Sequence, residues 1–397
     1  MMLAIAPEST LIVLLAVLTL GMVLPELLKK FRLPFITLII IAGAIFGPNF
    51  LGYVQANEIV SFFGFLGMAF LMLMAGLETD LSIIRKSKFK IVVMALLNGF
   101  IPLLVGFSIM LFFGYSIETS ILIGIISISS SVALIFPSLK EIKALGTGTI
   151  HLIMAAVVIT DVVSLIGVGI IFQSSSPITE LPLYIYFPVL LISIAVLFIL
   201  VPKVSNYILE KEFGGNKRYE ERLRFVIIIL IAVLIYFSLL GVHPILAAFL
   251  AGLSLSKVVM KEKTKIVHTK IHTLGYGLFV PVFFFIVGME LDLTVLFTFS
   301  SMSLIMPALI IGSIFAKFGS GLLAGKLVGL SKKATLVFGS ISITQLTTTL
   351  AVTYAAAALG LLDSLLVSTI IILALITTFV GPMLAKKFGE KPEEEFE

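Results

Sequence analysis

The residue with the clearest chemical potential in this sequence is Asp161, which lies in a long apolar run. The run covers residues 148–173, reads GTIHLIMAAVVITDVVSLIGVGIIFQ, and is long enough to cross a bilayer. Thirteen of its residues precede Asp161, which places the carboxyl group about 20 Å from one end of a helix. A carboxylate at that depth costs at least about 2.5 kcal/mol on insertion scales, so it indicates a functional site. The alternative is a structural carboxylate held by neighbouring donors.

One basic residue, Lys317, also lies deep in an apolar stretch, which reads IGSIFAKFGSGLLAGKLVGL. Lys326 follows nine residues later, roughly 13 Å along a helix. A lysine side chain can extend part of that distance toward the aqueous interface. The other interpretation is a buried cation near Asp161, which would serve as its counter-charge or as a proton carrier.

Two further apolar stretches carry clusters of hydroxyl side chains near their middle. The first, 119–138, contains Ser127, Ser129, Ser130, Ser131 and then Pro137; the second, 333–359, contains Ser340, Ser342, Thr344, Gln345, Thr347, Thr348 and Thr349. Where a helix unwinds inside a membrane, its free N–H and C=O groups need partners in protein or in a wet cavity. The clusters therefore favour two broken helices around a midplane ion site. Hydroxyls that bond back to their own helix are the simpler alternative.

The amino-acid composition indicates that these polar groups lie in a membrane protein. Of the 397 residues, 59% are hydrophobic and 12% are charged, whereas soluble domains are about 45–50% apolar and about 25% charged. A polytopic membrane protein is therefore expected. The sequence contains no cysteine, which excludes disulfides and cysteine-bound metals, and no cofactor is predicted.

Apolar runs of about 20 residues predict an all-α fold with thirteen transmembrane helices. The expected spans are 9–28, 34–51, 59–78, 89–113, 119–138, 148–172, 183–209, 223–241, 243–258, 272–289, 294–325, 333–359 and 364–385. Residues 386–397 are expected to form a short solvated cytoplasmic tail.

Lysine and arginine residues lie mostly in the loops that follow odd-numbered spans, such as 29–32, 85–90 and 211–224. The loops after even-numbered spans carry acids instead. The positive-inside rule therefore predicts an external N-terminus and a cytoplasmic C-terminus in a cell-membrane protein. The same distribution accounts for the net charge of +5 without a nucleic-acid partner.

A short motif occurs twice, as AGLETDL at the end of the third span and as VGMELDL at the end of the tenth. The matched residues are Gly76, Glu78 and Asp80 in the first copy and Gly288, Glu290 and Asp292 in the second. An odd number of spans separates the copies, which puts them on opposite sides of the membrane and predicts an inverted-topology repeat. The second and ninth spans add a weaker match, since each contains an Ala-Gly pair, at 42–43 and 251–252.

Taken in order, these features resemble the monovalent cation:proton antiporter-2 family, which holds the NapA-type sodium/proton antiporters and the Kef potassium systems. The resemblance covers essentially the whole membrane part. The segments that carry it are PFIT…AGAIFGP from Pro34, AGLETDL, the ISSS-x-A-L segment, Thr160-Asp161, HPILAAFLAGLSLS from His243, PVFFFIVGMELDL from Pro281 and the lysine in the eleventh span.

The resemblance implies a NapA/NhaA-like antiporter fold in which the fifth and twelfth spans are broken and cross. It also implies a mobile core, about 89–172 and 294–385, a dimerisation region, about 9–78 and 183–289, elevator-type alternating access and a homodimer. Asp161 matches the essential carboxylate of the family, and Lys317 matches the lysine beside it. Two departures stand out: Thr160 where many sodium antiporters have Asp and Kef-like proteins have Gln, and ITQLTTTL where relatives often carry charge.

The expected function is exchange of Na⁺ for H⁺, with Asp161 carrying each in turn. The residues expected to supply further ligand oxygens or to line the broken helices are Thr160, Ser130, Ser131, Ser129, Gln345, Thr347 and Thr348. K⁺ or Li⁺ in place of Na⁺ is an open alternative, as is sodium-coupled symport of a small organic anion, which needs a roomier polar pocket. A channel needs no titrating carboxylate. The H-E-x-x-H and G-x-G-D patterns of intramembrane enzymes are absent from the sequence.

Overall fold

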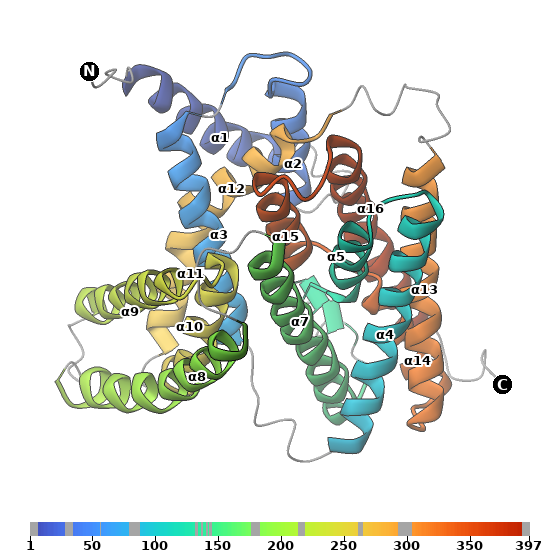
Figure 1. Ribbon diagram of the computed structural model, residues 1–397. Coiled ribbons are helices and arrows are strands. Elements are labelled where there is room, and N and C mark those ends of the chain that lie inside the picture. Colours follow the sequence, from blue (N-terminus) through green and yellow to red (C-terminus); the bar gives the residue numbers. More distant parts are fainter. Residues whose placement is uncertain are drawn as a thin grey trace. The chain divides into compact units, whose positions relative to one another are not determined.

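The computed structural model describes residues 7–27, 35–55, 57–78, 88–131, 134–135, 138–139, 142, 145–175, 183–212, 219–260, 265–292 and 304–390. These residues are predominantly helical (Figure 1). The helices are α1 (Pro7–Leu27), α2 (Phe35–Phe46), α3 (Glu58–Glu78), α4 (Lys88–Phe112), α5 (Ile117–Ile128), α7 (Thr147–Ser175), α8 (Leu183–Asn206), η3 (Tyr207–Glu212), α9 (Tyr219–Leu239), α10 (Pro244–Val259), α11 (Lys265–Leu274), η4 (Gly275–Phe279), α12 (Val280–Met289), α13 (Ile305–Leu327), α14 (Lys332–Ser342), α15 (Thr347–Ala358) and α16 (Ser364–Glu390).

The apolar helices coincide with the predicted spans. Among the described residues, nine helical segments are long and apolar enough to cross a membrane, and four shorter apolar helices accompany them. Each of the thirteen predicted spans overlaps one of these segments, although the bounds differ by several residues at many ends. The eleventh predicted span, 294–325, corresponds to α13, which begins at Ile305. The earlier part of that span, 294–303, lies outside the described residues.

The C-terminal boundary differs from the prediction. The tail was expected from residue 386, but α16 continues to Glu390. The charged residues there extend the helix, and Lys386 Nζ lies 3.9 Å from Glu390 Oε1 one turn later, a spacing that supports helical structure. Residues 391–397 lie outside the described residues.

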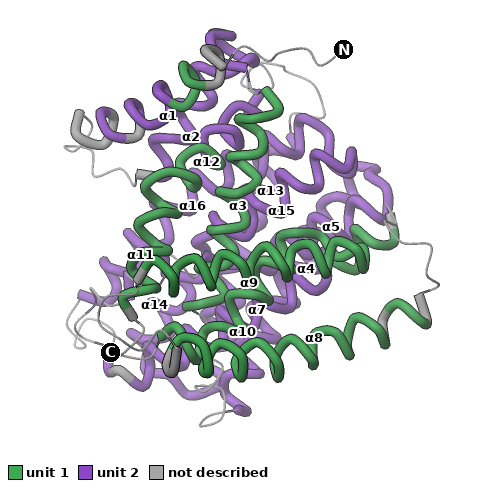
Figure 2. Tube along the Cα trace, turned by 90° about the vertical axis from the view of Figure 1, so that its left-hand side faces the viewer, with its two compact units in different colours: residues 1–14, 56–80, 169–283 green, residues 15–55, 81–168, 284–397 purple. Residues whose placement is uncertain are grey.

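The chain forms two compact units, coloured separately in Figure 2. Unit 1 consists of residues 1–14, 56–80 and 169–283, and unit 2 of residues 15–55, 81–168 and 284–397. Unit 2 contains both Asp161 and Lys317. The expected division into a mobile core and a dimerisation region has different boundaries, since it assigned residues 15–55 to the dimerisation region; that division stays a prediction.

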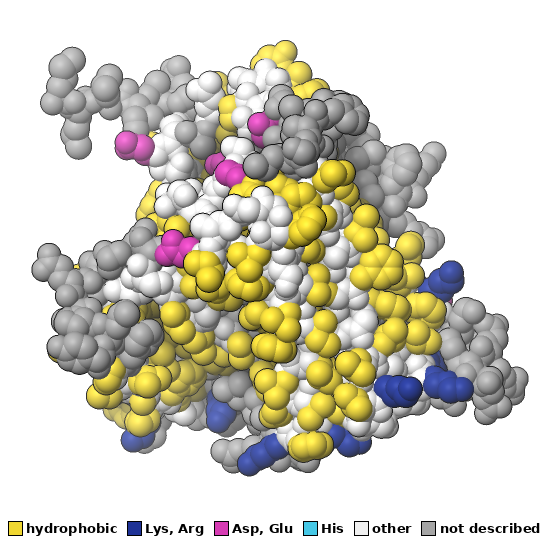
Figure 3. Space-filling model, turned by 45° about the vertical axis from the view of Figure 1, so that its right-hand side comes forward, with side chains coloured by type: hydrophobic (Ala, Val, Ile, Leu, Met, Phe, Trp, Pro, Cys, Tyr) yellow, Lys and Arg dark blue, Asp and Glu magenta, His cyan; other side chains and the backbone are white. Residues whose placement is uncertain are grey.

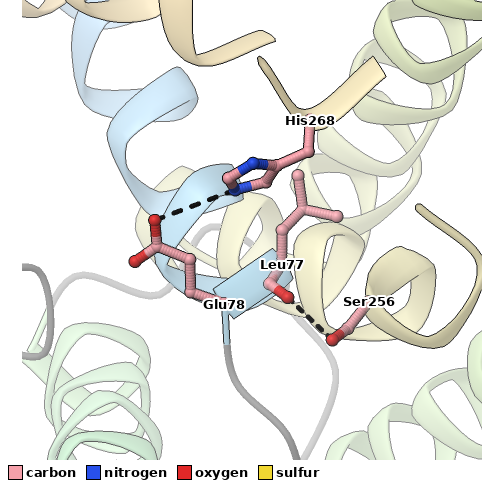
Figure 4. Close-up of polar contacts among 4 residues, drawn as sticks. All are labelled: Leu77, Glu78, Ser256 and His268. Carbon is pink, nitrogen blue, oxygen red and sulfur yellow. Dashed lines mark hydrogen bonds and ion pairs between the residues drawn. The ribbon is translucent and has the colours of Figure 1, made fainter. Parts of the chain in front are cut away.

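In unit 1, α3 and α10 pack tightly along each other. Glycine allows this approach, because a Cβ built on Gly252 would lie closer than 3.0 Å to the Leu73 carbonyl. The end of α3 is also fastened by polar groups (Figure 4). The Ser256 hydroxyl donates to the Leu77 carbonyl at 2.7 Å, and Glu78 Oε1 lies 3.8 Å from His268 Nε2 of α11. Polar contacts thus hold the last turn of α3 in place.

In unit 2, α4 packs against α5 and α13, α13 packs against α14, and α14 packs against α16. The buried core of this unit includes Met94 of α4, Val157 of α7 and Phe338 of α14. The outer side of α4 and α13 is apolar, and Figure 3 shows a broad area of hydrophobic side chains on the face that includes them. Such an exposed apolar surface is typical of contact with a membrane.

The loops at one end of unit 2 are joined by a hydrogen bond. The Tyr115 hydroxyl donates to Asp363 Oδ2 at 2.8 Å, while Asp363 Oδ1 accepts from the Leu366 amide at the start of α16. Burial, together with the Asp363 carboxylate, raises the pKa of Tyr115 above its ordinary value. This contact fixes the loop after α4 to the loop before α16.

A second glycine contact lies in unit 2 and gives a testable prediction. A Cβ on Gly43 of α2 would lie closer than 3.0 Å to the Phe285 carbonyl of α12. We expect Gly43→Ala to destabilise the protein by at least about 1 kcal/mol, because the backbone contact leaves no room for the methyl group. The measurement is thermal unfolding in detergent, followed by circular dichroism.

Gly319→Ala is the matched control, since a Cβ there would meet nothing within 4 Å. This change should leave stability unchanged or raise it by about 1 kcal/mol through helix propensity. A Gly43→Ala protein that melts at or above the wild-type temperature would contradict the packing of α2 on α12.

Candidate functional site

The site begins where α5 stops in the middle of its predicted span. Ser116 caps the start of α5 by accepting a hydrogen bond from the Thr119 amide, and the helix ends at Ile128. Ser129 then has an extended backbone, with φ −68° and ψ 153°. Residues 129–131 are not helical. The backbone groups freed by this break are available to bind other parts of unit 2.

A second break separates α14 from α15. Helix α14 ends at Ser342, α15 begins at Thr347, and Leu346 has φ −155° and ψ −78°. The two breaks contact each other through four hydrogen bonds, which are Ser131 N to Thr344 O at 2.8 Å, Ser129 Oγ with Thr349 Oγ1 at 2.7 Å, Ser131 Oγ with Thr347 Oγ1 at 3.3 Å, and Ser130 Oγ to Ser342 O at 3.2 Å. Helix α5 thus ends within the first hydroxyl cluster, α14 and α15 are interrupted at the second, and these two breaks contact each other. A pair of broken, crossing helices stays a prediction.

Asp161 lies on α7 beside these breaks and is only 3% exposed. The Ser130 amide donates to its Oδ1 at 3.0 Å, and the Thr348 hydroxyl donates to its Oδ2 at 3.2 Å. One turn further along α7, the Ser164 hydroxyl donates to the Ile125 carbonyl of α5 at 2.9 Å. This contact holds α7 against α5 and so directs the carboxylate toward the end of α5.

Lys317 is completely buried in α13 and does not extend toward the surface. Its ammonium donates to the Ser130 hydroxyl at 3.0 Å, to Asn98 Oδ1 at 3.5 Å and to the Asn98 carbonyl at 3.4 Å. It also donates to the Ile128 carbonyl at the end of α5. Lys317 therefore lies near Asp161 and shares Ser130 with it as a hydrogen-bond partner, while its role as counter-charge or proton carrier stays a prediction.

Asn98 of α4 is a site residue that the sequence analysis did not select. It is 1% exposed, and its side-chain amide donates to Ser320 Oγ at 3.1 Å and to the Lys317 carbonyl at 3.4 Å. The available signal was one uncharged amide within the apolar run KIVVMALLNGFIP. Buried polar groups in such a run normally have a specific partner, here the lysine of α13.

Ser130 connects the two charges, since its amide donates to Asp161 and its hydroxyl accepts from Lys317. The helix ends match the charges as well. The carbonyl of Ile128, at the C-terminal end of α5, faces the ammonium, and Thr348, in the first turn of α15, faces the carboxylate. A helix C-terminus favours a cation and a helix N-terminus favours an anion.

Among the predicted site residues, Ser130 and Thr348 donate to the carboxylate, and the others have different partners. The Thr160 hydroxyl donates to the Val157 carbonyl of its own helix at 2.7 Å, the usual backbone contact of a threonine within a helix. Gln345 contributes its backbone, which pairs with the Thr377 hydroxyl at 3.2 Å, while its buried side-chain oxygen has no hydrogen-bond partner among the described residues.

The resulting arrangement is a set of oxygens around one carboxylate. It offers hydroxyls, backbone carbonyls and Asp161, which are ligands for a hard cation, and the carboxylate alternatively accepts a proton. Among the described residues, no group of three or more His, Cys, Asp or Glu side chains could hold a metal ion.

Comparison with known proteins identifies the family. A family model described as "Sodium/hydrogen exchanger, transmembrane" matches residues 13–387. The chain belongs to the sodium/hydrogen exchanger family. It is 29% identical over 380 residues to "Probable Na(+)/H(+) antiporter 3" of Methanocaldococcus jannaschii, covering 96% of each chain. It is 27% identical over 372 residues to "Na(+)/H(+) antiporter" of Enterococcus hirae, covering 91% of this chain and 94% of that protein.

The fold is shared with a solved structure of the sodium proton antiporter MjNhaP1 from Methanocaldococcus jannaschii. The TM-score is 0.73 at 18% identity, and the match covers 95% of this chain and 97% of that chain. Family and apolar helices together make this chain a multi-pass membrane transporter rather than an enzyme. The matched family is broader than the antiporter-2 branch inferred from the motifs, and the narrower assignment stays a prediction.

The Thr348 contact with Asp161 gives a prediction for this exchanger. Thr348→Val keeps the side-chain shape but removes one of the two donors to the carboxylate. A hydrogen bond to a charged group contributes about 1.5–3 kcal/mol, so we expect the KM for the exchanged cation to rise about tenfold. The measurement is cation-driven dissipation of a pH gradient in proteoliposomes.

Thr353→Val on the same helix is the control. Thr353 is equally buried, but its hydroxyl donates to the Thr349 carbonyl of its own helix at 2.7 Å. Its KM should stay within about twofold of wild type. Equal effects of the two substitutions would mean that the Thr348 contact has no special role in ion binding.

Proposed function

We propose that this protein exchanges Na⁺ for H⁺ across the membrane, with Asp161 binding each ion in turn. The observation that carries the proposal is the buried Asp161 carboxylate, which lies beside two helix breaks and accepts one hydrogen bond on each oxygen from the part of the chain that the structure describes. One carboxylate neutralises one cation or one proton, so the two ions compete for it. The antiporters of M. jannaschii and E. hirae are named for Na⁺ and H⁺, which supports Na⁺ over K⁺ as the exchanged cation.

The proposed cation ligands come from the two breaks. Asp161 supplies the charge, and the Thr348 hydroxyl bonded to it supplies a neutral oxygen. Further neutral oxygens are the paired hydroxyls of Ser131 and Thr347 and the hydroxyl of Ser130, the residue whose amide donates to Asp161. Thr160 drops out of the proposed ligand set, because its hydroxyl is bonded to Val157. Water would complete the coordination, since a hard monovalent cation prefers several oxygen ligands.

Lys317 is proposed as the fixed counter-charge. Its ammonium donates to Asn98, Ile128 and Ser130, and these acceptors favour the protonated form. If Lys317 keeps its proton throughout the cycle, the sodium-loaded and proton-loaded sites carry the same net charge. Exchange is then one Na⁺ for one H⁺ and moves no net charge.

The proposal also includes the inverted-topology repeat and the transport motion of the whole chain. An inverted-topology repeat is supported by matched glycine contacts: α3 meets α10 at Gly76 and Gly252, and α2 meets α12 at Gly43 and Gly288. These four glycines come from the motifs that recur in the sequence. We accordingly propose elevator-type alternating access of a mobile core in a homodimer, within a cell membrane, with an external N-terminus and a cytoplasmic C-terminus.

Asp161→Asn tests the central assignment. The amide has the same shape but carries no negative charge, so it should hold neither ion as the carboxylate does. We expect proteoliposomes with this variant to dissipate a pH gradient on Na⁺ addition no faster than empty liposomes. Glu390→Gln, which removes a surface carboxylate paired with Lys386, should match wild type. Sodium-driven proton flux that survives in the Asn variant would sink the proposal.

The stoichiometry has its own test. Proteoliposomes with the membrane potential clamped by K⁺ and valinomycin should show the same sodium-driven proton flux at potentials of either sign, because one-for-one exchange moves no net charge. A flux that changes severalfold with the clamped potential would instead mean that more than one proton is exchanged for each cation, with Lys317 carrying the second proton.

A further inference from the structure

A groove on unit 2 lies next to the ion site and is distinct from it. It has a volume of about 200 Å³ and is formed by residues of α4, α5 and α7. Its lining includes Leu96, Gly99 and Phe100 of α4, Ile128 of α5, and Thr160 and Val163 of α7. The ion exchange described above assigns no role to this groove.

The groove has an apolar lining, because its one threonine presents a methyl group to it. Thr160 is the one hydroxyl-bearing residue among the described lining residues, and its oxygen is bonded to the Val157 carbonyl. Its methyl carbon lies 3.7 Å from the position of a Cβ on Gly99, so the methyl group faces the floor of the groove. Water needs two or more polar partners to be stable in a cavity. The chemistry of the groove therefore fits a hydrocarbon ligand.

The position of the groove indicates the source of that hydrocarbon. Leu96, Phe100 and Val163 line it and are 62%, 58% and 52% exposed. They lie on α4 and α7, two helices long and apolar enough to cross a membrane, so the surroundings of the groove are the acyl chains of the bilayer. We propose that this groove binds one acyl chain of a membrane lipid.

The bound chain would contact the outer side of the ion site. Ile128 has its side chain in the groove and its carbonyl on the Lys317 ammonium. Gly99 follows Asn98, which binds Lys317, and Thr160 precedes Asp161. The backbone at Ile128, at Asn98–Gly99 and at Thr160–Asp161 thus forms a wall between the groove and the ion site. Lipid binding in this groove does not depend on the proposed ion exchange.

The experiment uses the absence of tryptophan from the sequence. Phe100→Trp places a single fluorophore in the groove, and Phe315→Trp places one on the exposed side of α13, where Phe315 is 69% exposed. Asn98 of α4 and Lys317 of α13 contact each other. Phe100 is two residues from Asn98 and Phe315 is two residues from Lys317, a distance of about 3 Å along each helix. The two reporters therefore have similar depth in the membrane. Each variant, purified in detergent, is titrated with phosphatidylcholine brominated on one acyl chain.

We expect the Phe100→Trp fluorescence to be quenched with saturation at about one lipid per protein, and unbrominated lipid to reverse the quenching. The Phe315→Trp protein should show only weak, non-saturating quenching. Gly99→Leu in the Phe100→Trp background should abolish the saturable component, because the side chain fills the groove. Gly99→Ala, whose Cβ makes only ordinary contacts of 3.4 Å or more, should weaken it and serves if the leucine variant does not fold.

Equal, non-saturating quenching of both reporters would overturn the proposal, and so would saturable quenching that persists unchanged in both Gly99 variants. Because fluorescence reports lipid binding without ion transport, the result is independent of the Asp161→Asn experiment. Quenching as expected together with sodium-driven flux in the Asn variant would retain the lipid site and remove only the proposed ion exchange.

Discussion

The constraint on which the site depends is the burial of two opposite charges in one helical unit. Asp161 and Lys317 are both almost inaccessible to solvent, and an isolated charge in such surroundings is strongly destabilising. Both side chains bind the same residue: the Ser130 amide donates a hydrogen bond to the carboxylate, and the Ser130 hydroxyl accepts one from the ammonium. The carboxylate is thereby stabilised by two donors and makes no direct ion pair with Lys317, as the proposed exchange of ions requires.

The two helix breaks supply what this arrangement needs. A continuous α5 would use the Ser130 amide and the Ile128 carbonyl within the helix, and neither could then reach a buried charge. Breaking α5 makes these groups available to Asp161 and Lys317, and breaking the helix formed by α14 and α15 brings Thr348 to the carboxylate. The remaining free groups pair across the breaks, as Ser131 and Thr344 do. The breaks therefore create the site and satisfy their own backbone at the same time.

Much of this could be predicted from the sequence, because the strongest signals are local. A carboxylate within an apolar run and two hydroxyl clusters indicated where the charge and the breaks lie. Asn98 could not be found in this way, since its partner Lys317 is 219 residues distant and only the packing of α4 on α13 brings them together. The orientation of Thr160 was equally out of reach, because one side-chain torsion decides whether its hydroxyl faces the carboxylate or its own helix.

Thr160 also links the ion site to the stoichiometry proposed for it. With its hydroxyl on Val157, it presents a methyl group to an apolar groove. An acidic side chain in this orientation would face that groove and lose its hydration without gaining a partner, which is unfavourable. The wall between the groove and the site therefore suits an uncharged residue. Among the described residues, Asp161 is the carboxylate that the Ser130 amide and the Thr348 hydroxyl bind. One carboxylate and one well-bonded lysine are the charge arrangement on which the proposed one-for-one exchange rests.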